Sequence, residues 1–283
     1  MTQRQNPDAH HGIFSPLNPL HIFMIEIFNT VLYEPLFNAL IWLFQVTSDF
    51  GIAILLLTLA IKLLLFWPSM SSIKAQKQLQ ETQPKLDALR KKYANNKEEL
   101  GKEMIKFYKE NKVNPLSSCL PLLIQLPILI ALYQVFFNGL HTDPATGFLV
   151  AEQLQHLYGP LRDMYSHTAI ETHFLGLFDL AKTGNYVIAI LAALFQFLSS
   201  RLSLRRQVAP VKTPGAADEN MTAAINKQMM YFLPIITVIF GVRFPAGVTF
   251  YWLISTVFTL AQQMYVFRRF KKDDSKAIID IKE

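Results

Sequence analysis

Four long stretches of this chain contain no charged residue, and they constrain the fold more than any other feature. They cover residues 116–138, 186–200, 228–242 and 244–267. A helix needs about 17 to 25 apolar residues to cross the hydrocarbon core of a bilayer, and the first and last stretches reach that length. Hydrophobic residues make up 51% of the chain and charged residues only 17%, which disfavours a soluble domain. The sequence therefore predicts an all-α protein that crosses a membrane several times.

The charged residues between these stretches predict how the chain is oriented. Residues 71–112 carry eleven Lys or Arg against six Asp or Glu, whereas residues 139–182 carry two against five. Basic residues also outnumber acidic ones by five to two in 201–227 and by six to four in 268–283. Because cytoplasmic loops are enriched in Lys and Arg, these three basic regions are expected in the cytoplasm. Alternation then gives five spans, with the N-terminus outside and the C-terminus in the cytoplasm.

The predicted division of the chain follows from this alternation. A flexible segment at 1–21 precedes a helix at 22–48, a core at 49–267 and a basic cytoplasmic tail at 268–283. Within the core we expect spans at about 49–67, 116–138, 185–202, 228–243 and 244–267, a cytoplasmic hairpin at 71–112, an outer loop at 139–184 and a cytoplasmic loop at 203–227. The hairpin is predicted because leucines recur at helical spacing on both sides of Asn95 and Asn96, which favour a turn.

The stretch at 22–46 allows two interpretations. It is apolar enough for a sixth span, but Glu26, Glu34 and Pro35 interrupt it, and little positive charge precedes it. Charged residues are costly within a span and tolerated at an interface. We therefore expect an amphipathic helix that lies on the outer membrane surface, with the sixth span as the alternative.

Lys62 is the only charged residue within the five predicted spans that lies away from their ends. A cation at such a position usually faces a protein interior or a water-filled cavity. It also lies five residues before Trp67, so its long side chain could instead reach the cytoplasmic interface. The other spans carry neutral polar residues that permit a wet pocket or hydrogen bonds between helices, namely Gln125, Gln134, Gln196, Ser199, Ser255, Thr256, Gln262 and Gln263.

No pattern in the sequence indicates a catalytic, cofactor or metal site. The chain has no H-E-x-x-H motif, phosphate-binding loop or nucleophile elbow. Four histidines in the outer loop are scattered without the spacing of metal ligands. The first twenty residues lack the features of a signal peptide, and the single cysteine, Cys119, excludes an internal disulfide. We expect neither an enzyme nor a bound cofactor.

Three motifs resemble the YidC family of membrane insertases, the bacterial relatives of the mitochondrial Oxa and chloroplast Albino insertases. Residues 113–133, VNPLSSCLPLLIQLPILIALY, resemble the second core span of that family. Phe244-Pro-Ala-Gly247 followed by Tyr251-Trp252 resembles the opening of its last span, and Gln83-Pro84 resembles the start of its cytoplasmic hairpin. The resemblance covers residues 33–272 in the same order.

The resemblance implies a five-helix core, in the cell inner (plasma) membrane, with a hydrophilic groove open to the cytoplasm and to lipid. The family's groove arginine falls on Lys62, which keeps the charge but not the bidentate geometry of a guanidinium. Gln196 and Trp252 match groove-lining positions, and Thr256 stands where the family usually has asparagine. With Gln125 and Tyr251 these residues form the expected substrate groove.

The implied activity is that of an insertase and chaperone for nascent membrane proteins, without nucleotide hydrolysis. Its expected partners are nascent chains and the lipid bilayer, with the ribosome and the Sec translocon as further candidates. The basic tail suits either ribosomal RNA or anionic lipid headgroups and the positive-inside signal. Two other readings stay open from the residues alone: an anion transporter or channel centred on Lys62, and a structural assembly factor in which Lys62 is dispensable.

Overall fold

A computed structural model of the chain describes residues 19–93, 95–111, 114, 120–140, 142–143, 146–204 and 217–280. The chain before residue 19, Cys119 and residues 205–216 of the expected cytoplasmic loop lie outside the described residues. The described elements are mostly helices: α1 (Pro19–Phe28), η1 (Asn29–Tyr33), α2 (Glu34–Thr47), α3 (Phe50–Leu64), α4 (Phe66–Lys92), α5 (Lys97–Glu110), α6 (Leu120–Gln134), η3 (Val135–Gly139), α7 (Ala151–Leu154), α8 (Gly159–Tyr165), α9 (Tyr186–Leu204), α10 (Ala217–Arg243) and α11 (Ala246–Asp280).

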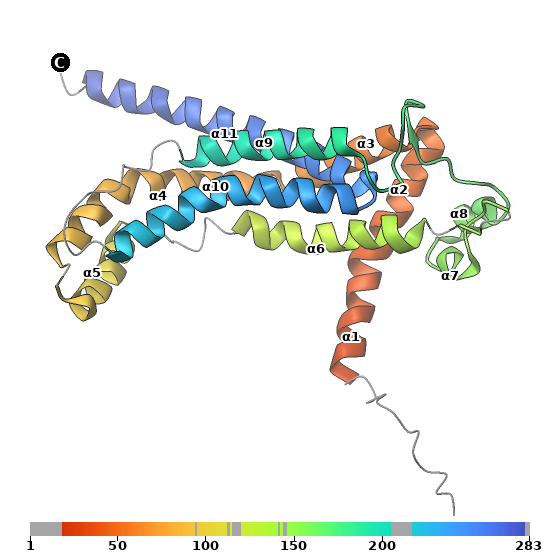
Figure 1. Cartoon of the computed structure of the whole chain (residues 1–283), viewed down its shortest axis with the longest axis horizontal. Helices are drawn as coiled ribbons and strands as arrows, with labels where there is room; N and C mark the ends of the chain where they lie inside the picture. The colour runs from red at the N-terminus through yellow and green to blue at the C-terminus, as the bar shows by residue number, and fades with distance from the viewer. Residues whose placement is uncertain are drawn as a thin grey trace, which may run out of the picture.

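The long helices form a bundle around α11. Helices α3, α4, α6, α9, α10 and α11 run along the long axis of the molecule (Figure 1). Helix α9 packs against both α10 and α11, and α11 also contacts α3, α4 and α6. Side chains on several faces of α11 are therefore enclosed by neighbouring helices. The all-helical character expected from the sequence is confirmed for this part of the chain.

A bend separates α3 from α4. Helix α3 ends at Leu64, and the two helices meet at an angle of 66° across Leu65. Pro68 accounts for the break, because its ring nitrogen cannot donate to the carbonyl of Leu64. The sequence predicted one uninterrupted span over 49–67, and the bend lies inside that range.

The expected cytoplasmic hairpin corresponds to α4 and α5, which pack against each other at one end of the bundle (Figure 1). The turn between them includes Asn96, whose side chain caps α5 by accepting a hydrogen bond from the backbone N–H of Glu99. Pro84 lies inside α4. The end of α11 lies at the same end of the molecule as this hairpin (Figure 1).

Helices α1, η1 and α2 form one long rod that lies across the bundle rather than along it (Figure 1). Residues Phe23–Thr47 of this rod are long and apolar enough to cross a membrane. The π-helical turn η1 comes directly before Pro35, which cannot donate a backbone hydrogen bond. Composition alone thus permits a span, while the crosswise orientation favours a helix on the membrane surface. The surface position stays a prediction.

Of the remaining described helices, Tyr186–Ser203 is also long and apolar enough to span a membrane, as is the pair Phe50–Leu64 and Phe66–Leu79 if it is one bent span. The apolar segments Leu123–Gly139 and Met230–Arg243 are shorter. Helix α9 continues past Arg201 to Leu204, two residues beyond the predicted span of about 185–202. Arg201 lies in the last turn of this helix.

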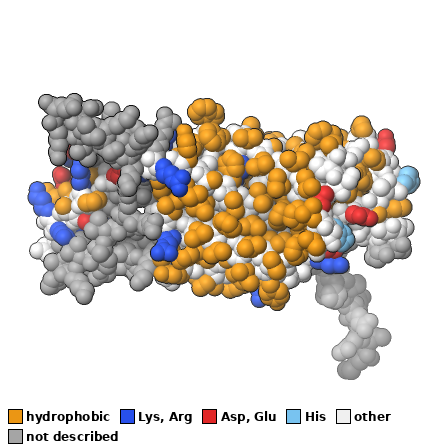
Figure 2. All heavy atoms as spheres, turned by 90° about the horizontal axis from the view of Figure 1, so that it is seen from above, with side chains coloured by type: hydrophobic (Ala, Val, Ile, Leu, Met, Phe, Trp, Pro, Cys, Tyr) orange, Lys and Arg blue, Asp and Glu red, His pale blue; other side chains and the backbone are white. Residues whose placement is uncertain are grey.

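A broad apolar surface covers the middle of the molecule on the face drawn in Figure 2. Figure 2 shows hydrophobic side chains over the central part of this face, with Lys, Arg, Asp and Glu side chains toward both ends and His toward the end away from the hairpin. Helices α9 and α10 supply many exposed apolar residues, including Tyr186, Ile190, Leu194, Phe232, Ile235 and Ile239. Apolar surface of this extent would be costly in water and is suited to lipid. The orientation of the chain across the membrane stays a prediction.

The end of the bundle opposite the hairpin is tightly packed and holds the short elements. The strands β1 (His173–Phe174) and β2 (Phe178–Asp179) pair antiparallel here. Asp49 joins them to the bundle: Oδ1 accepts from the N–H of Ile52 at 2.8 Å, capping α3, and Oδ2 accepts from the N–H of Leu175 at 2.6 Å. The Phe50 ring is fully buried and meets Phe136 edge-to-face, with ring centroids 5.9 Å apart. This packing joins α3, η3 and the short strands at this end of the molecule.

Candidate functional site

One face of α11 carries a row of polar residues inside the bundle. Tyr251, Ser255, Thr259 and Gln262 are spaced by four, four and three residues, which places them on one side of a helix. Tyr251, Ser255 and Gln262 are buried, and Thr259 is half-buried. We call these four residues the polar face of α11. Because polar groups without partners are costly in a membrane, each is expected to find a partner on another helix.

Lys62 of α3 points at this face. Its Nζ donates a hydrogen bond to Thr259 Oγ1 at 3.2 Å, and Thr259 Oγ1 in turn donates to the carbonyl of Ser255 at 2.9 Å. The lysine side chain is half-buried and makes no ion pair with any residue that the structure describes. The sequence left open whether Lys62 faces the protein interior or reaches the cytoplasmic interface. This contact supports a side chain directed toward the interior of the bundle. A cation here has spare donors for an anionic partner.

Gln125 of α6 contacts the polar face of α11 at Tyr251 and Ser255. Its Nε2 donates to the hydroxyl of Tyr251, and its Oε1 accepts from Ser255 Oγ at 3.5 Å. The Tyr251 side chain is only 1% exposed, so this amide supplies its hydroxyl with a partner inside the bundle. Lys62, Gln125 and Tyr251, which the sequence analysis selected, are therefore linked through Ser255 and Thr259.

Near the hairpin, the polar face meets the beginning of α4. Ser69 Oγ donates to Gln262 Oε1 at 3.1 Å, which connects α4 to α11 just beyond the bend at Leu65. Gln262 Nε2 is buried without a hydrogen-bond partner among the described residues. An amide donor without a partner in an apolar interior is costly, so it is a candidate for contact with water or a ligand.

Gln263 belongs to a second contact, with α9. Its Oε1 accepts from Ser199 Oγ at 3.0 Å, and its Nε2 donates to Ser203 Oγ at 3.2 Å. Gln196 lies on the same side of α9 by helical spacing and is half-buried. These bonds hold α9 and α11 together. Hydrogen bonding between helices is one of the two roles that the sequence permitted for these polar residues.

Trp252 and Thr256, also selected from the sequence, lie on α11 but give no side-chain hydrogen bond to the polar face among the described residues. Trp252 is half-buried against the core, and its buried Nε1 has no partner among the described residues. Thr256 Oγ1 donates to the carbonyl of Trp252 at 2.8 Å, within its own helix. Thr256 therefore satisfies its hydroxyl locally and does not reproduce an outward-facing amide.

The sequence analysis missed Thr259 and Ser69. Thr259 comes four residues after Ser255, so helical spacing could have selected it as part of the same face. Ser69 follows Pro68 and looked like part of a short connection between a span and the hairpin. Its contact with Gln262 depends on how α4 packs on α11, which spacing within one segment does not reveal.

Gln134 and Gln125 lie on the same predicted span but serve different places. Gln134 lines a separate pocket at the opposite end of the molecule, together with Tyr33 and residues of the outer loop.

The structure also contains no group of three or more His, Cys, Asp or Glu side chains arranged to hold a metal among the residues it describes. The arrangement around Lys62 offers a single cation and neutral hydrogen-bonding groups, without an acid–base pair.

Comparisons with known proteins match residues 42–274 to the family described as 60Kd inner membrane protein. The chain is 36% identical over 236 residues to the membrane protein insertase YidC of Streptomyces avermitilis, covering 80% of this chain and 53% of that protein. It is 32% identical over 242 residues to the YidC of Lawsonia intracellularis, covering 85% of this chain and 39% of that one.

A third relative, the YidC of Haemophilus influenzae, is 30% identical over 241 residues and is covered over 37% of its length. The chain thus spans about half or less of the length of these relatives. The matched region contains every span predicted from the sequence, and the apolar surface agrees with a location in the membrane. This chain belongs to the 60Kd inner membrane protein family, the family of the YidC insertases.

Proposed function

We propose that this chain is a membrane protein insertase and chaperone that passes nascent chains into the bilayer along a hydrophilic groove. The observation that carries the proposal is the contact between Lys62 and Thr259, which directs a cation toward a buried polar face inside an apolar bundle. Family membership supports the activity, since the relatives at 30 to 36% identity are named as insertases. No observation on the described residues favours the anion transporter.

The groove residues in this proposal are Lys62, Gln125, Gln196, Tyr251, Trp252 and Thr256, together with Thr259 and Gln262. Lys62 supplies the charge, and Trp252 Nε1 and Gln262 Nε2 are buried donors available to the polar groups of a passing chain or to water. Gln125 and Tyr251 fix α6 against α11 at the end of the groove nearer the outer loop. Gln196 and Thr256 line the groove without forming the lysine site.

The proposed mechanism begins with attraction between Lys62 and an acidic segment of the substrate. Two unit charges about 4 Å apart attract by about 4 kcal/mol at an effective dielectric near 20, against about 1 kcal/mol in water. Partial burial of Lys62 therefore strengthens its hold on a carboxylate. The apolar helix of the substrate then moves into lipid, where each buried methylene contributes about 0.8 kcal/mol. No nucleotide is needed to drive the transfer.

The proposed topology places the N-terminus outside and the hairpin and C-terminus in the cytoplasm of the inner membrane, with five spans. Support comes from the excess of Lys and Arg over Asp and Glu in residues 71–112 and from the reverse excess in residues 139–182. Helix α10 contributes the apolar segment Met230–Arg243, which is short for a span and would suit a locally thinned bilayer. Nascent chains are the proposed partners, with the ribosome and the Sec translocon as candidates at the cytoplasmic side.

Reconstitution into liposomes tests this proposal. Vesicles that contain the protein should insert a short single-span substrate with an acidic outer segment, and empty vesicles should not. The same vesicles should not release a trapped small anion faster than empty ones. Anion release without insertion would identify the transporter as the correct function and the insertase as wrong.

A further inference from the structure

A second pocket lies at the end of the molecule away from the hairpin, outside the groove proposed above. It has a volume of about 410 Å3 and lies between η1, the end of α6, η3 and α7. All but one of the described residues that line it are polar, the exception being Val150. The polar ones are Tyr33, Gln134, Asn138, Glu152, Gln153 and His156. This volume is within the range typical of small-ligand sites.

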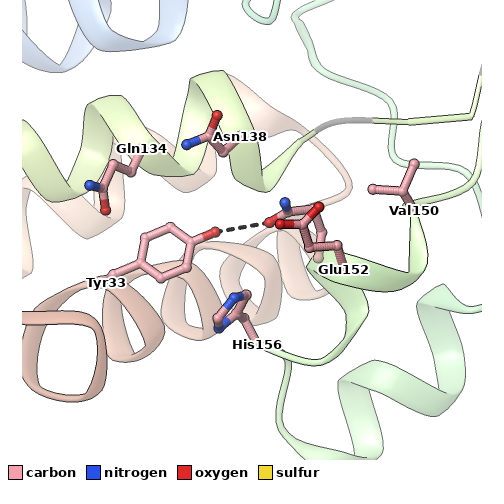
Figure 3. Close-up of a pocket in the computed structure, with 7 residues that line it drawn as sticks. Tyr33, Gln134, Asn138, Val150, Glu152 and His156 are labelled. Atoms are coloured by element: carbon pink, nitrogen blue, oxygen red, sulfur yellow. Dashed lines mark hydrogen bonds between the residues drawn. The ribbon is translucent and has the colours of Figure 1, made fainter. Parts of the chain in front are cut away.

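Hydrogen bonds among the walls fix the shape of the pocket. Tyr33 donates its hydroxyl hydrogen to Gln153 Oε1 at 3.1 Å, and both side chains are buried (Figure 3). His156 packs edge-to-face on the Tyr33 ring, with centroids 5.3 Å apart, and its Nδ1 lies 3.1 Å from Glu34 Oε1. Asn38 ties the same segments together by donating to the carbonyl of His156 at 2.9 Å. The walls are therefore formed before any ligand arrives.

The chemistry of the walls favours a small cation. Among the described residues that line the pocket, Glu152 is the only carboxylate, and none is Lys or Arg. Figure 3 shows Glu152 on the side toward which the Tyr33 hydroxyl points, with Gln134 and Asn138 on the helix above the Tyr33 ring. The amide oxygens of Gln134 and Asn138 supply further acceptors. The Glu34 carboxylate behind His156 adds negative charge.

A primary ammonium group fits these walls better than a metal ion does. It carries three N–H donors, which match one carboxylate and two amide oxygens. A divalent metal ion usually takes several charged or imidazole ligands. No group of three such side chains occurs among the described residues.

The position of the pocket indicates which kind of molecule carries the ammonium group. The rod of α1, η1 and α2 exposes apolar side chains immediately before the pocket, including Met24, Ile27 and Val31, which is 63% exposed. Such a rod, lying across the end of the bundle, suits the level of the lipid headgroups (Figure 1). A lipid whose tails lie beside these residues could place its headgroup in the pocket.

We propose that this pocket binds the primary ammonium group of a phospholipid headgroup and thereby fixes the α1–α2 rod to the outer surface of the bilayer. The inference requires that this end of the protein lies at headgroup level, but not that the protein inserts other proteins. Phosphatidylethanolamine is the test lipid, since it carries the ammonium group. Phosphatidylglycerol is the comparison lipid without one.

The test measures lipids retained by the purified full chain, by native mass spectrometry after extraction from mixed vesicles of these two lipids. The variant Glu152→Gln removes the charge at nearly constant shape. Glu171→Gln is the matched control, because Glu171 is also an exposed carboxylate of the outer loop and does not line the pocket. Glu152→Gln should lower the preference for phosphatidylethanolamine by about tenfold, as the loss of one charged hydrogen bond would predict. Glu171→Gln should leave it unchanged.

Three results would overturn the proposal. The first is an equal effect of the two variants, and the second is no preference for phosphatidylethanolamine in the unchanged chain. The third is binding of free ethanolamine that depends on Glu152 while phosphatidylethanolamine is not preferred, which would make the pocket a site for soluble amines. The variant Glu152→Asp keeps the charge and should retain most of the preference, which separates the lost charge from damage to the fold. Failure of this test would leave the insertion assay unaffected.

Discussion

The Nζ of Lys62 lies 3.2 Å from the hydroxyl oxygen of Thr259, although 197 residues separate them in sequence. This contact joins α3 to the central helix of the bundle and directs the cation toward buried polar groups. The hydroxyl of Thr259 donates in turn to the carbonyl of Ser255 and so presents its oxygen to the lysine. The position of the charge therefore depends on a neutral residue of α11.

A substitution series at Lys62 tests whether its charge acts in insertion. Lys62→Arg should keep insertion of substrates with an acidic outer segment, because it keeps the cation. Lys62→Ala should lower that insertion about tenfold or more, since about 1.4 kcal/mol of lost attraction corresponds to one factor of ten. Protease protection of the substrate in reconstituted vesicles measures the yield. Equal yields for the two variants at equal protein content would remove Lys62 from the mechanism.

Substitution of Thr259 tests the contact itself. Thr259→Val keeps the shape of the side chain and removes the oxygen that accepts from Lys62, so the lysine should turn away from the polar face. We expect insertion of acidic substrates to fall about two- to fivefold, as the loss of about 0.5 to 1 kcal/mol would predict. Thr237→Val is the matched control, because the Thr237 hydroxyl bonds within α10 to the carbonyl of Leu233. A similar loss in both variants would indicate a general effect of the lost hydroxyl.

Much of the helical bundle could be predicted from the apolar stretches, because a charge-free run of this length has few stable folds outside a membrane. The bend between α3 and α4 was missed, although Pro68 was visible. A proline near the end of an apolar run is equally compatible with a kink, a helix start and a loop. Helix α9 ends at Leu204, close to the predicted end at about 202, and it contains Arg201 in its final turn.

The candidate site was predictable residue by residue but not as an arrangement. Lys62 and Gln125 were selected because polar groups are rare and costly in apolar helices. Which polar side chains contact one another depends on packing between helices. Gln125 contacts Tyr251, whereas Gln134 of the same predicted span lines the second pocket, beside Tyr33. Likewise, Thr256 matched a family position, yet its hydroxyl bonds within its own helix. Contacts between distant segments are not contained in the spacing within each segment.

Asp179, in the β-hairpin formed by β1 and β2, allows a pH-dependent test. Burial opposes ionisation of this carboxyl, but hydrogen bonds from Thr172, Lys182 and the backbone of Ala181 hold its pKa below the usual value. A lowered pKa in the folded state means that these bonds contribute stability above the unfolded pKa, about 3.9, and lose it as the pH falls through the folded pKa.

The local stability of β1–β2 should therefore be constant near neutral pH and fall only below about pH 4. Asp179→Asn should lower the local stability of the β1–β2 hairpin by about 1 to 2 kcal/mol at neutral pH, because charged hydrogen bonds are lost. Amide hydrogen exchange at Leu180, whose N–H bonds to the carbonyl of Thr172, measures both effects. Unchanged exchange in the variant at neutral pH would contradict this role of Asp179.

Close packing between α11 and η3 gives the last prediction. A Cβ atom added at Gly247 would lie only 2.2 Å from the Phe136 ring, which is 4% exposed and held edge-to-face against Phe50. Gly247→Ala should therefore force a shift in the packed end of the bundle and destabilise the fold by about 1 to 3 kcal/mol. Gly101→Ala is the opposite case, because nothing lies within 4 Å of the added atom on the exposed helix α5. Alanine there should stabilise the helix by about 0.5 to 1 kcal/mol, and thermal unfolding in detergent should show a lower midpoint for Gly247→Ala than for Gly101→Ala.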